Sequence, residues 1–365
     1  MKRKKGYFVD NGRNSGGRFR MLQIESIILY SIKQLNRERT IYSIYHLLNG
    51  KKSSQTIQDA HLFSLKSFFG IYDQLSREGF EEIIQSMTDK KWINNIGQQR
   101  FNLTNHGITL LANMQLPEYI NGWNYHQITN LFWERLSLLV QVVSNFMFGE
   151  TKYIPIQKNK EVHSWLKSFL KNINIPRKKM GLIVYSELNE CFDVAKEVDP
   201  SLLVFRLTGF RQIGLTPLQV AKQFNLNHHD YQIGFTNTLH YLIHKIKEDG
   251  KQFKILSFLI SDLMQDDELT LSSRKTQSLL NQGYTLDRIA NIRHLKLSTI
   301  EDHLVELALN IESFSIDTYV EIELQKRILE ISQQIATKQL KLIREKIVNA
   351  TYFQIRLVLA KYGDR

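Results

Sequence analysis

Cysteine is nearly absent from this chain: Cys191 is the only one among 365 residues. A single thiol excludes an intrachain disulfide and a cysteine-rich zinc site, and we expect it to be a small buried apolar group. Uninterrupted apolar runs of about 18 residues, which a membrane-spanning helix needs, are also missing. The basic N-terminus lacks the apolar stretch of a signal peptide. These absences predict a cytoplasmic protein with no membrane partner, and they leave association with the nucleoid open.

Motifs for catalysis are missing as well. The sequence has no phosphate-binding G-x-x-x-x-G-K-[ST], no H-E-x-x-H and no nucleophile elbow, so it indicates neither nucleotide hydrolysis nor these classes of hydrolase. His240 and His244 are spaced as zinc ligands on a helix can be. Nothing near them supplies a general base, however, and we favour ordinary histidines on a polar helix face. We therefore predict a protein that is not an enzyme and takes no cofactor or metal.

Proline is scarce, with 5 residues, while apolar residues recur at helical spacing along most of the chain. This pattern predicts a mainly α fold, and the length predicts two or three domains. We expect a winged-helix-like domain at residues 21–113, a helical middle domain at 114–268 and a helix-turn-helix domain with further C-terminal helices at 269–365. The acidic group Asp266, Asp267 and Glu268 marks an expected linker before the last domain.

The net charge of +12 is unevenly distributed. Residues 1–20 hold seven lysines and arginines against Asp10, which accounts for half of the excess. This segment reads either as a basic disordered tail, which can bind phosphate nonspecifically, or as a non-native extension before a start at Met21. The other 345 residues carry 41 basic and 35 acidic side chains, an excess that we take to be spread thinly. The basic composition is therefore weak support for DNA binding.

The first domain shows the order of elements of a winged helix. An apolar helix face runs through residues 24–35, a short helix follows at 40–48, and Ser53 or Ser54 can cap a third helix. After a long amphipathic helix, the stretch WINNIGQQRFNLT (92–104) reads as strand, Asn/Gly turn and strand. We predict a small β-hairpin wing there.

The middle domain offers fewer signals. LTPLQVAKQFNLN (215–227) is either a second helix-turn-helix or an ordinary helical hairpin, with Thr216 as N-cap and Pro217 at the first helical position. Large aromatic residues are expected to build the core of this domain rather than a platform for stacking bases: Trp123, Tyr125, Phe132, Trp133 and Trp165.

The C-terminal domain contains the clearest motif, LLNQGYTLDRIANIRHLKLSTIEDHLVELA (279–308). Gly283 ends one helix in a tight turn, and the small side chain of Ala290 lets the next two helices cross closely. The expected N-caps in this domain are Ser272 or Ser273, then Thr285, then Ser298 or Thr299. We predict a helix-turn-helix, but its second helix carries three acids and no lysine or arginine, which suits a DNA groove poorly.

Candidate binding residues follow from these patterns. In the winged domain, phosphate contacts are expected from Lys51, Lys52, Lys90, Lys91 and Arg100, unless these are only solubilising charges. In the helix-turn-helix, the candidates for DNA contact are Arg288, Arg293, Lys296 and Ser298. The acids of the second helix are instead candidates for docking a protein partner: Glu301, Asp302 and Glu306.

Two stretches resemble accessory domains of RecQ helicases. RTIYSIYHLLNGKKSSQTIQDAHLFSLKSFFGIYDQLSREGFEEIIQSMTDKKWI (39–93), closed by RFNLTNHG (100–107), is similar to the winged helix that follows the RecQ motor. SRKTQSLLNQGYTLDRIANIRHLKLSTIEDHLVELA (273–308), with TYFQIRLVLAKYG (351–363), is similar to the helicase-associated helix-turn-helix near RecQ C-termini. With its helical middle, the chain resembles the YpbB family of Firmicutes, whose gene commonly lies beside one for a short RecQ-type helicase.

The departures from RecQ limit what this resemblance implies. The motor domains, the four zinc-binding cysteines and the aromatic residue at the wing tip are all missing. The resemblance therefore implies a noncatalytic accessory protein in DNA repair or recombination, which binds a short RecQ-type helicase and, largely nonspecifically, DNA. The alternative is a sequence-specific helix-turn-helix transcription regulator that reads an operator with residues 298–308. The oligomeric state stays open.

Overall fold

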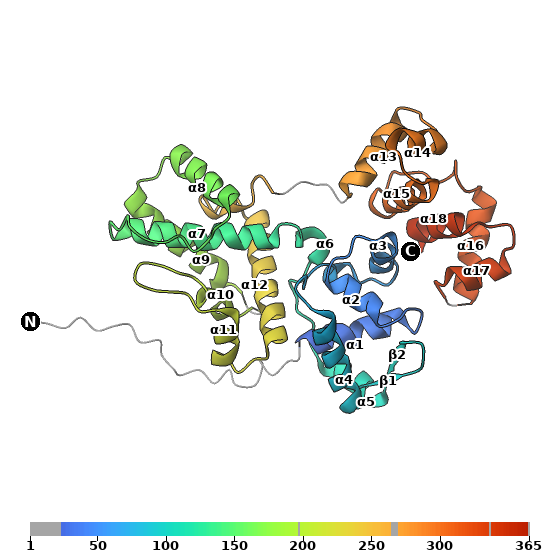
Figure 1. Cartoon of the computed structure of the whole chain (residues 1–365), viewed down its shortest axis with the longest axis horizontal. Coiled ribbons are helices and arrows are strands. Elements are labelled where there is room, and N and C mark those ends of the chain that lie inside the picture. Colours follow the sequence, from blue (N-terminus) through green and yellow to red (C-terminus); the bar gives the residue numbers. More distant parts are fainter. Residues whose placement is uncertain (1–22, 196–197, 264–268, 336, 364–365) are drawn as a thin grey trace, which may run out of the picture.

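The computed structural model of the chain describes residues 23–195, 198–263, 269–335 and 337–363. Within these ranges it contains eighteen α-helices and one two-stranded antiparallel sheet (Figure 1), which confirms the predicted mainly α fold. The predicted tail at residues 1–20 and the acidic group Asp266, Asp267 and Glu268 lie outside the described residues.

The N-terminal part is a winged helix, as predicted. Its elements are α1 (Gln23–Leu35), α2 (Tyr42–Leu48), α3 (Ser54–Leu62), a 3₁₀ turn (Lys66–Phe68), α4 (Arg77–Asp89), β1 (Ile93–Asn95), β2 (Phe101–Leu103) and α5 (Asn105–Asn113). The two strands pair from Ile93↔Leu103 to Asn95↔Phe101 and form the wing. Ser53 is the N-cap of α3, and its hydroxyl accepts a hydrogen bond from the Thr56 amide.

The middle part is helical throughout its described residues. It comprises α6 (Gly122–Tyr125), α7 (Thr129–Met147), α8 (Lys160–Asn172), α9 (Arg177–Asp193), α10 (Ser201–Val204), α11 (Pro217–Gln223), α12 (His228–Glu248) and a 3₁₀ turn (Leu256–Leu259). The prediction for 215–227 holds locally, because Thr216 caps α11 in a capping box with Gln219, and Pro217 is its first residue. However, α12 is mostly buried and belongs to the core, whereas only Val220 and Ala221 of α11 are buried.

The C-terminal part consists of α13 (Leu271–Asn281), α14 (Leu286–Arg293), α15 (Leu297–Asn310), α16 (Ile322–Gln334), α17 (Leu340–Lys346) and α18 (Tyr352–Tyr362). Thr285 caps α14 as predicted. Two other predicted caps are wrong. The N-cap of α13 is Thr270 rather than Ser272 or Ser273, and α15 begins at Leu297, before Ser298 and Thr299, with Lys296 at the N-cap position and no side-chain cap.

Two hydrophobic cores organise these elements. One lies within the middle part, around α7, α9 and α12. The other joins the winged helix to the C-terminal helices, since buried residues from α1 to β1 and from α14 to α18 form one cluster. Figure 1 shows the same arrangement: the C-terminal helices lie beside α3, although more than 200 residues separate them in sequence.

The winged helix is also tied to the middle part. The Asp230 carboxylate, in the first turn of α12, accepts hydrogen bonds from the backbone amides of Gln23 (2.7 Å) and Ile24 (3.3 Å). It thereby satisfies amides at the start of α1 that have no partner within their own helix. The prediction that Trp123 belongs to the core of the middle part is wrong. Its ring packs against His61 and Phe69, in the cluster of the winged helix.

Candidate nucleic-acid interface

The helix-turn-helix of α14 and α15 has the expected local geometry. Gly283 has a φ of +83°, which an L side chain rarely adopts, and it ends the α13 turn as predicted. His294 takes a left-handed conformation at the end of α14 (φ +51°) and lets the chain reverse into α15. Ile289, Ala290, Ile300 and Leu304 are buried where the helices meet. The motif is therefore a true helix-turn-helix.

Its second helix is buried rather than presented to solvent. α15 packs against α3, α13, α14 and α18, and residues 303–308 are all buried. Only its start is well exposed, at Leu297 and Ser298. A helix that reads a groove must offer its side chains to base edges. Most of α15 instead forms the centre of the C-terminal part.

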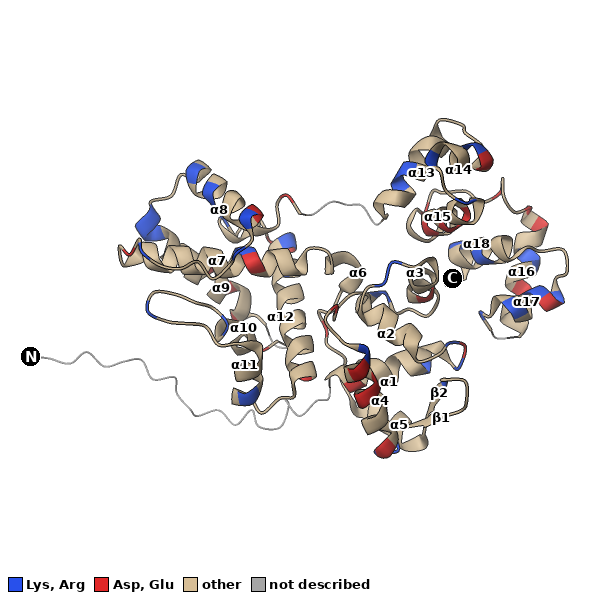
Figure 2. Ribbon diagram, in the orientation of Figure 1, with Lys and Arg blue, Asp and Glu red and all other residues tan. Residues whose placement is uncertain are grey.

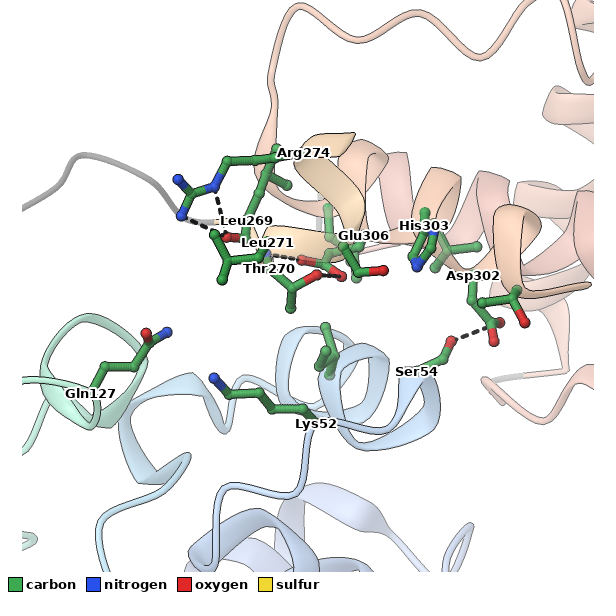
Figure 3. A pocket seen from close by; sticks show the side chains of 15 residues that line it. Lys52, Ser54, Gln127, Leu269, Thr270, Leu271, Arg274, Asp302, His303 and Glu306 are labelled. Carbon is green, nitrogen blue, oxygen red and sulfur yellow. Dashed lines mark hydrogen bonds between the residues drawn. The ribbon is translucent and has the colours of Figure 1, made fainter. Parts of the chain in front are cut away.

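The Glu306 carboxylate is occupied inside the protein. It accepts hydrogen bonds from the Thr270 amide (2.5 Å) and the Thr270 hydroxyl (3.1 Å) (Figure 3). It also accepts one from the Ser273 hydroxyl (2.6 Å). These donors lie at the N-terminus of α13, where a negative charge is favourable. Glu306 therefore holds α13 against α15, and its side chain is only 7% exposed.

Asp302 connects α15 to two other helices. Its carboxylate pairs with the Arg356 guanidinium of α18 at 2.7 Å and accepts a hydrogen bond from the Ser54 hydroxyl of α3 at 2.9 Å. Arg356 also donates to Gln58 of α3 at 3.1 Å. Glu301 is half-buried beside this group, and burial raises the pKa of its carboxyl. Asp302 thus contacts the winged helix of its own chain, whereas Glu306 contacts the start of α13.

A second polar contact joins the same two parts. The Glu38 carboxylate, between α1 and α2, accepts hydrogen bonds from the Thr337 hydroxyl (2.9 Å) and the Lys338 amide (3.0 Å). Beside the Asp302 contact lies a cleft of about 490 Å³, into which Lys52 projects from the winged-helix side (Figure 3). Together with the shared core, these contacts fix the helix-turn-helix on the winged helix.

The basic candidates of the helix-turn-helix differ in their surroundings. Arg293 donates to the Ser272 carbonyl at 2.8 Å, to the Ser272 hydroxyl at 2.9 Å and to Thr276, and burial lowers the pKa of its guanidinium. His303 lies against it, and burial lowers the pKa of this imidazole to about 4. Arg293 is therefore engaged in internal packing. Arg288, Lys296 and Ser298 remain exposed.

The basic candidates of the winged helix lie on three separate segments. Lys51 and Lys52 precede α3, Lys90 and Lys91 follow α4, and Arg100 is half-buried before β2. The Lys90 ammonium lies 4.6 Å from the centre of the Trp92 ring. Between these segments, the exposed face of α4 is acidic (Figure 2), with Glu78, Glu81, Glu82 and Asp89. The helix before the wing would therefore repel phosphates.

A strongly basic stretch of the middle part was not among the predicted binding sites. Residues 151–179 contain eight lysines and arginines and a single acid, Glu161. Outside this stretch and residues 1–20, the chain has 33 basic and 34 acidic side chains. The expectation that the remaining positive charge is spread thinly is therefore wrong. A count of charge in a sliding window would have found this stretch, whereas averages over a whole domain concealed it.

Both ring nitrogens of His240 in α12 have partners within the protein. His240 is buried, and its Nδ1 accepts a hydrogen bond from the Asn121 amide at 3.0 Å, so its Nε2–H donates to the Thr129 hydroxyl at 3.0 Å. Burial lowers the pKa of this imidazole to about 3. His240 thus lies in the core rather than on the expected polar face. Cys191 is buried as expected, and burial raises the pKa of its thiol to about 12.

No group of three or more His, Cys, Asp or Glu in the described part of the chain is arranged to hold a metal ion. No helix among those residues is both long and apolar enough to cross a membrane.

Comparison with known proteins supports the assignment of the motif. A family model described as a helix-turn-helix domain matches residues 272–359, which span α13 to α18. Protein YpbB of Bacillus subtilis (strain 168) is 33% identical over 341 residues, covering 92% of this chain and 96% of that protein. No solved structure matches the chain. The similarity runs through all three parts of the fold, and the chain therefore belongs to the YpbB family of helix-turn-helix proteins.

Proposed function

We propose that this protein is a noncatalytic accessory factor for a short RecQ-type DNA helicase and acts with it in DNA repair or recombination. The proposal starts from the resemblance of both terminal parts to domains that RecQ helicases carry beside their motor. The observation that carries it furthest is the shared core of these two parts. They pack on each other through this core, which suits an appendage that docks as a unit onto a motor on another chain.

DNA contact belongs to the same proposal. The exposed basic candidates are Lys51, Lys52, Lys90 and Lys91 of the winged helix and Arg288 and Lys296 of the helix-turn-helix, with Arg100 and Ser298 beside them. Such scattered charges suit phosphate contacts, which hold the protein on DNA without reading sequence. Of the three acids proposed to dock a partner protein, Glu301 is the one without a hydrogen bond or ion pair among the described residues, while Asp302 and Glu306 are held by the chain itself.

Sequence-specific regulation of transcription is the second candidate, because the match to a helix-turn-helix domain favours it. It would require residues 298–308 to enter a groove. Burial of residues 303–308 weighs against that arrangement. We rank it below the accessory role.

Co-purification with the short RecQ-type helicase of the same organism tests the accessory role. We expect a complex at micromolar concentrations and a change in the unwinding rate when the full-length protein is added. Absence of both would refute the proposal. Binding to one operator about a thousandfold more tightly than to other duplexes at physiological salt would instead favour the regulator.

A further inference from the structure

The middle part carries the most basic surface among the described residues. All eight lysines and arginines of residues 151–179 are exposed, and none forms an ion pair within the described part of the chain. Figure 2 shows this charge on α8 and close to it, away from the acidic α4. These side chains repel one another because few carboxylates lie among them. Binding of an anionic partner would reduce that repulsion.

On α8 the charge forms one continuous stripe. Lys160, Ser164, Lys167, Ser168 and Lys171 are exposed, and their spacing of three and four residues places them on one side of the helix. At a rise of about 1.5 Å per residue, the stripe is about 16 Å long. That length corresponds to about five base pairs of duplex, which present about ten phosphate charges.

The opposite side of α8 holds the stripe in place. Val162, Leu166 and Phe169 are buried in the core of the middle part, so the helix cannot turn its lysines away. An interfacial helix inserts its apolar side into the membrane. The apolar side of α8 is buried in the core and is not available for such insertion.

The start of α9 extends the same surface. Arg177, Lys178 and Lys179 occupy its first turn and are exposed. The Arg177 guanidinium lies 5.3 Å from the centre of the Phe146 ring, at the end of α7. Gly181 follows, and a Cβ there would lie 2.1 Å from the Met147 sulfur, so the two helices cross closely. The first turn of α9 is therefore as firmly placed as α8.

The chemistry of this surface favours nucleic-acid phosphates over an acidic protein. The α8 stripe offers lysine ammonium groups and serine hydroxyls, which bind phosphate oxygens but do not discriminate between bases. Protein interfaces usually centre on aromatic, methionine or arginine anchors and are depleted in lysine, whereas five of the six basic residues on α8 and in the first turn of α9 are lysines.

We propose that the α8–α9 basic surface, defined as Lys160, Lys167, Lys171, Arg177, Lys178 and Lys179, is the principal DNA-binding surface of this protein. It binds the phosphate backbone without sequence preference, and the helix-turn-helix serves mainly as a structural module. The inference deepens the DNA-binding half of the proposed function and does not depend on the helicase.

The test compares three full-length variants with equal loss of charge. The first is Lys160→Gln/Lys167→Gln/Lys171→Gln on α8. The second removes winged-helix candidates, Lys51→Gln/Lys52→Gln/Lys91→Gln. The third is a control on exposed residues of α16 and α17, Lys326→Gln/Arg327→Gln/Lys341→Gln. Binding to a fluorescent 30-base-pair duplex of arbitrary sequence is measured by anisotropy over a series of salt concentrations.

We expect the α8 variant to bind at least tenfold more weakly than the wild type, with the slope of log K against log salt reduced by about 3, because each lost phosphate contact removes about 0.9. The control variant should change affinity less than threefold, and the winged-helix variant should lose less affinity than the α8 variant. A fourth variant, Lys160→Arg/Lys167→Arg/Lys171→Arg, changes the same positions but keeps their charge. It should bind as the wild type, which would show that the α8 variant loses affinity through its charge and not through substitution at these positions.

Three results would overturn the inference. They are equal losses in the α8 and control variants, a larger loss in the winged-helix variant, and tighter binding to phosphatidylserine vesicles than to the duplex. The measurement uses the protein without its helicase, so its failure leaves the partnership untouched. Conversely, an α8 variant that still co-purifies with the helicase but has lost the duplex would support both proposals separately.

Discussion

The buried carboxylate of Glu306 allows a sharp test of whether the acidic helix α15 is a docking surface or a structural support. Glu306 accepts three hydrogen bonds at the start of α13, from the Thr270 amide and hydroxyl and from the Ser273 hydroxyl. Each hydrogen bond to a charged group contributes about 1.5–3 kcal/mol, and the three are not additive. We expect Glu306→Ala to lower the free energy of unfolding by about 3–5 kcal/mol, in the range for breaking a buried charge contact.

Glu306→Gln is the more informative variant, because it keeps the shape and one acceptor oxygen. We expect a loss of about 1.5–3 kcal/mol. The matched control is Glu301→Gln on the same helix. Glu301 is half-buried, has no hydrogen bond among the described residues, and burial raises the pKa of its carboxyl. Removing its charge should change stability by less than about 0.5 kcal/mol.

Urea unfolding followed by circular dichroism gives the two free energies, and hydrogen exchange of residues 271–281 locates the effect. Faster exchange of α13 in Glu306→Gln, but not in Glu301→Gln, is the expected pattern. Equal stability of the two variants would refute the structural role. So would a Glu306→Gln protein of unchanged stability that no longer binds the helicase, since this would make Glu306 a docking residue.

Two further predictions concern the joins between the parts and their dependence on pH. Arg356→Met removes the 2.7 Å ion pair to Asp302 and its hydrogen bonds to α3, and we expect a loss of about 1–3 kcal/mol in urea unfolding. Lys326→Met, which breaks a pair between exposed side chains, should cost less than about 0.5 kcal/mol. His240 is neutral in the fold because burial lowers its pKa to about 3. The unfolded chain takes up this proton below pH 6.5, so stability is full above that pH and falls toward pH 3, by about 2 kcal/mol from pH 7 to pH 5. In His240→Gln the same drop in pH should cost about 2 kcal/mol less, and an unchanged pH dependence would contradict the assignment.

Local features of the fold were readable because they depend on neighbours in sequence. Gly283, Thr285 and Thr216 act where predicted, since positive φ and N-capping are properties of a few consecutive residues. The wing followed from a strand, Asn/Gly turn and strand pattern within 13 consecutive residues, 92–104. The missed caps at Thr270 and Lys296 shift the starts of their helices by two or three residues, the scale on which pattern specifies helix ends poorly.

The sequence by itself determined the mainly helical fold, the helix-turn-helix, the wing and the family. It also contained the charge of residues 151–179, a property of composition that no tertiary contact is needed to reveal. Only the tertiary structure decided which side chains remain free to act. The periodicity of α15 shows that one side is apolar, but not that α3, more than 200 residues away, and α18 cover the helix. That packing buries Glu306 and pairs Asp302 with Arg356, while contacts with α13 engage Arg293. The apolar side of α8 packs into the other core, that of the middle part, and the lysines of α8 are therefore exposed to solvent.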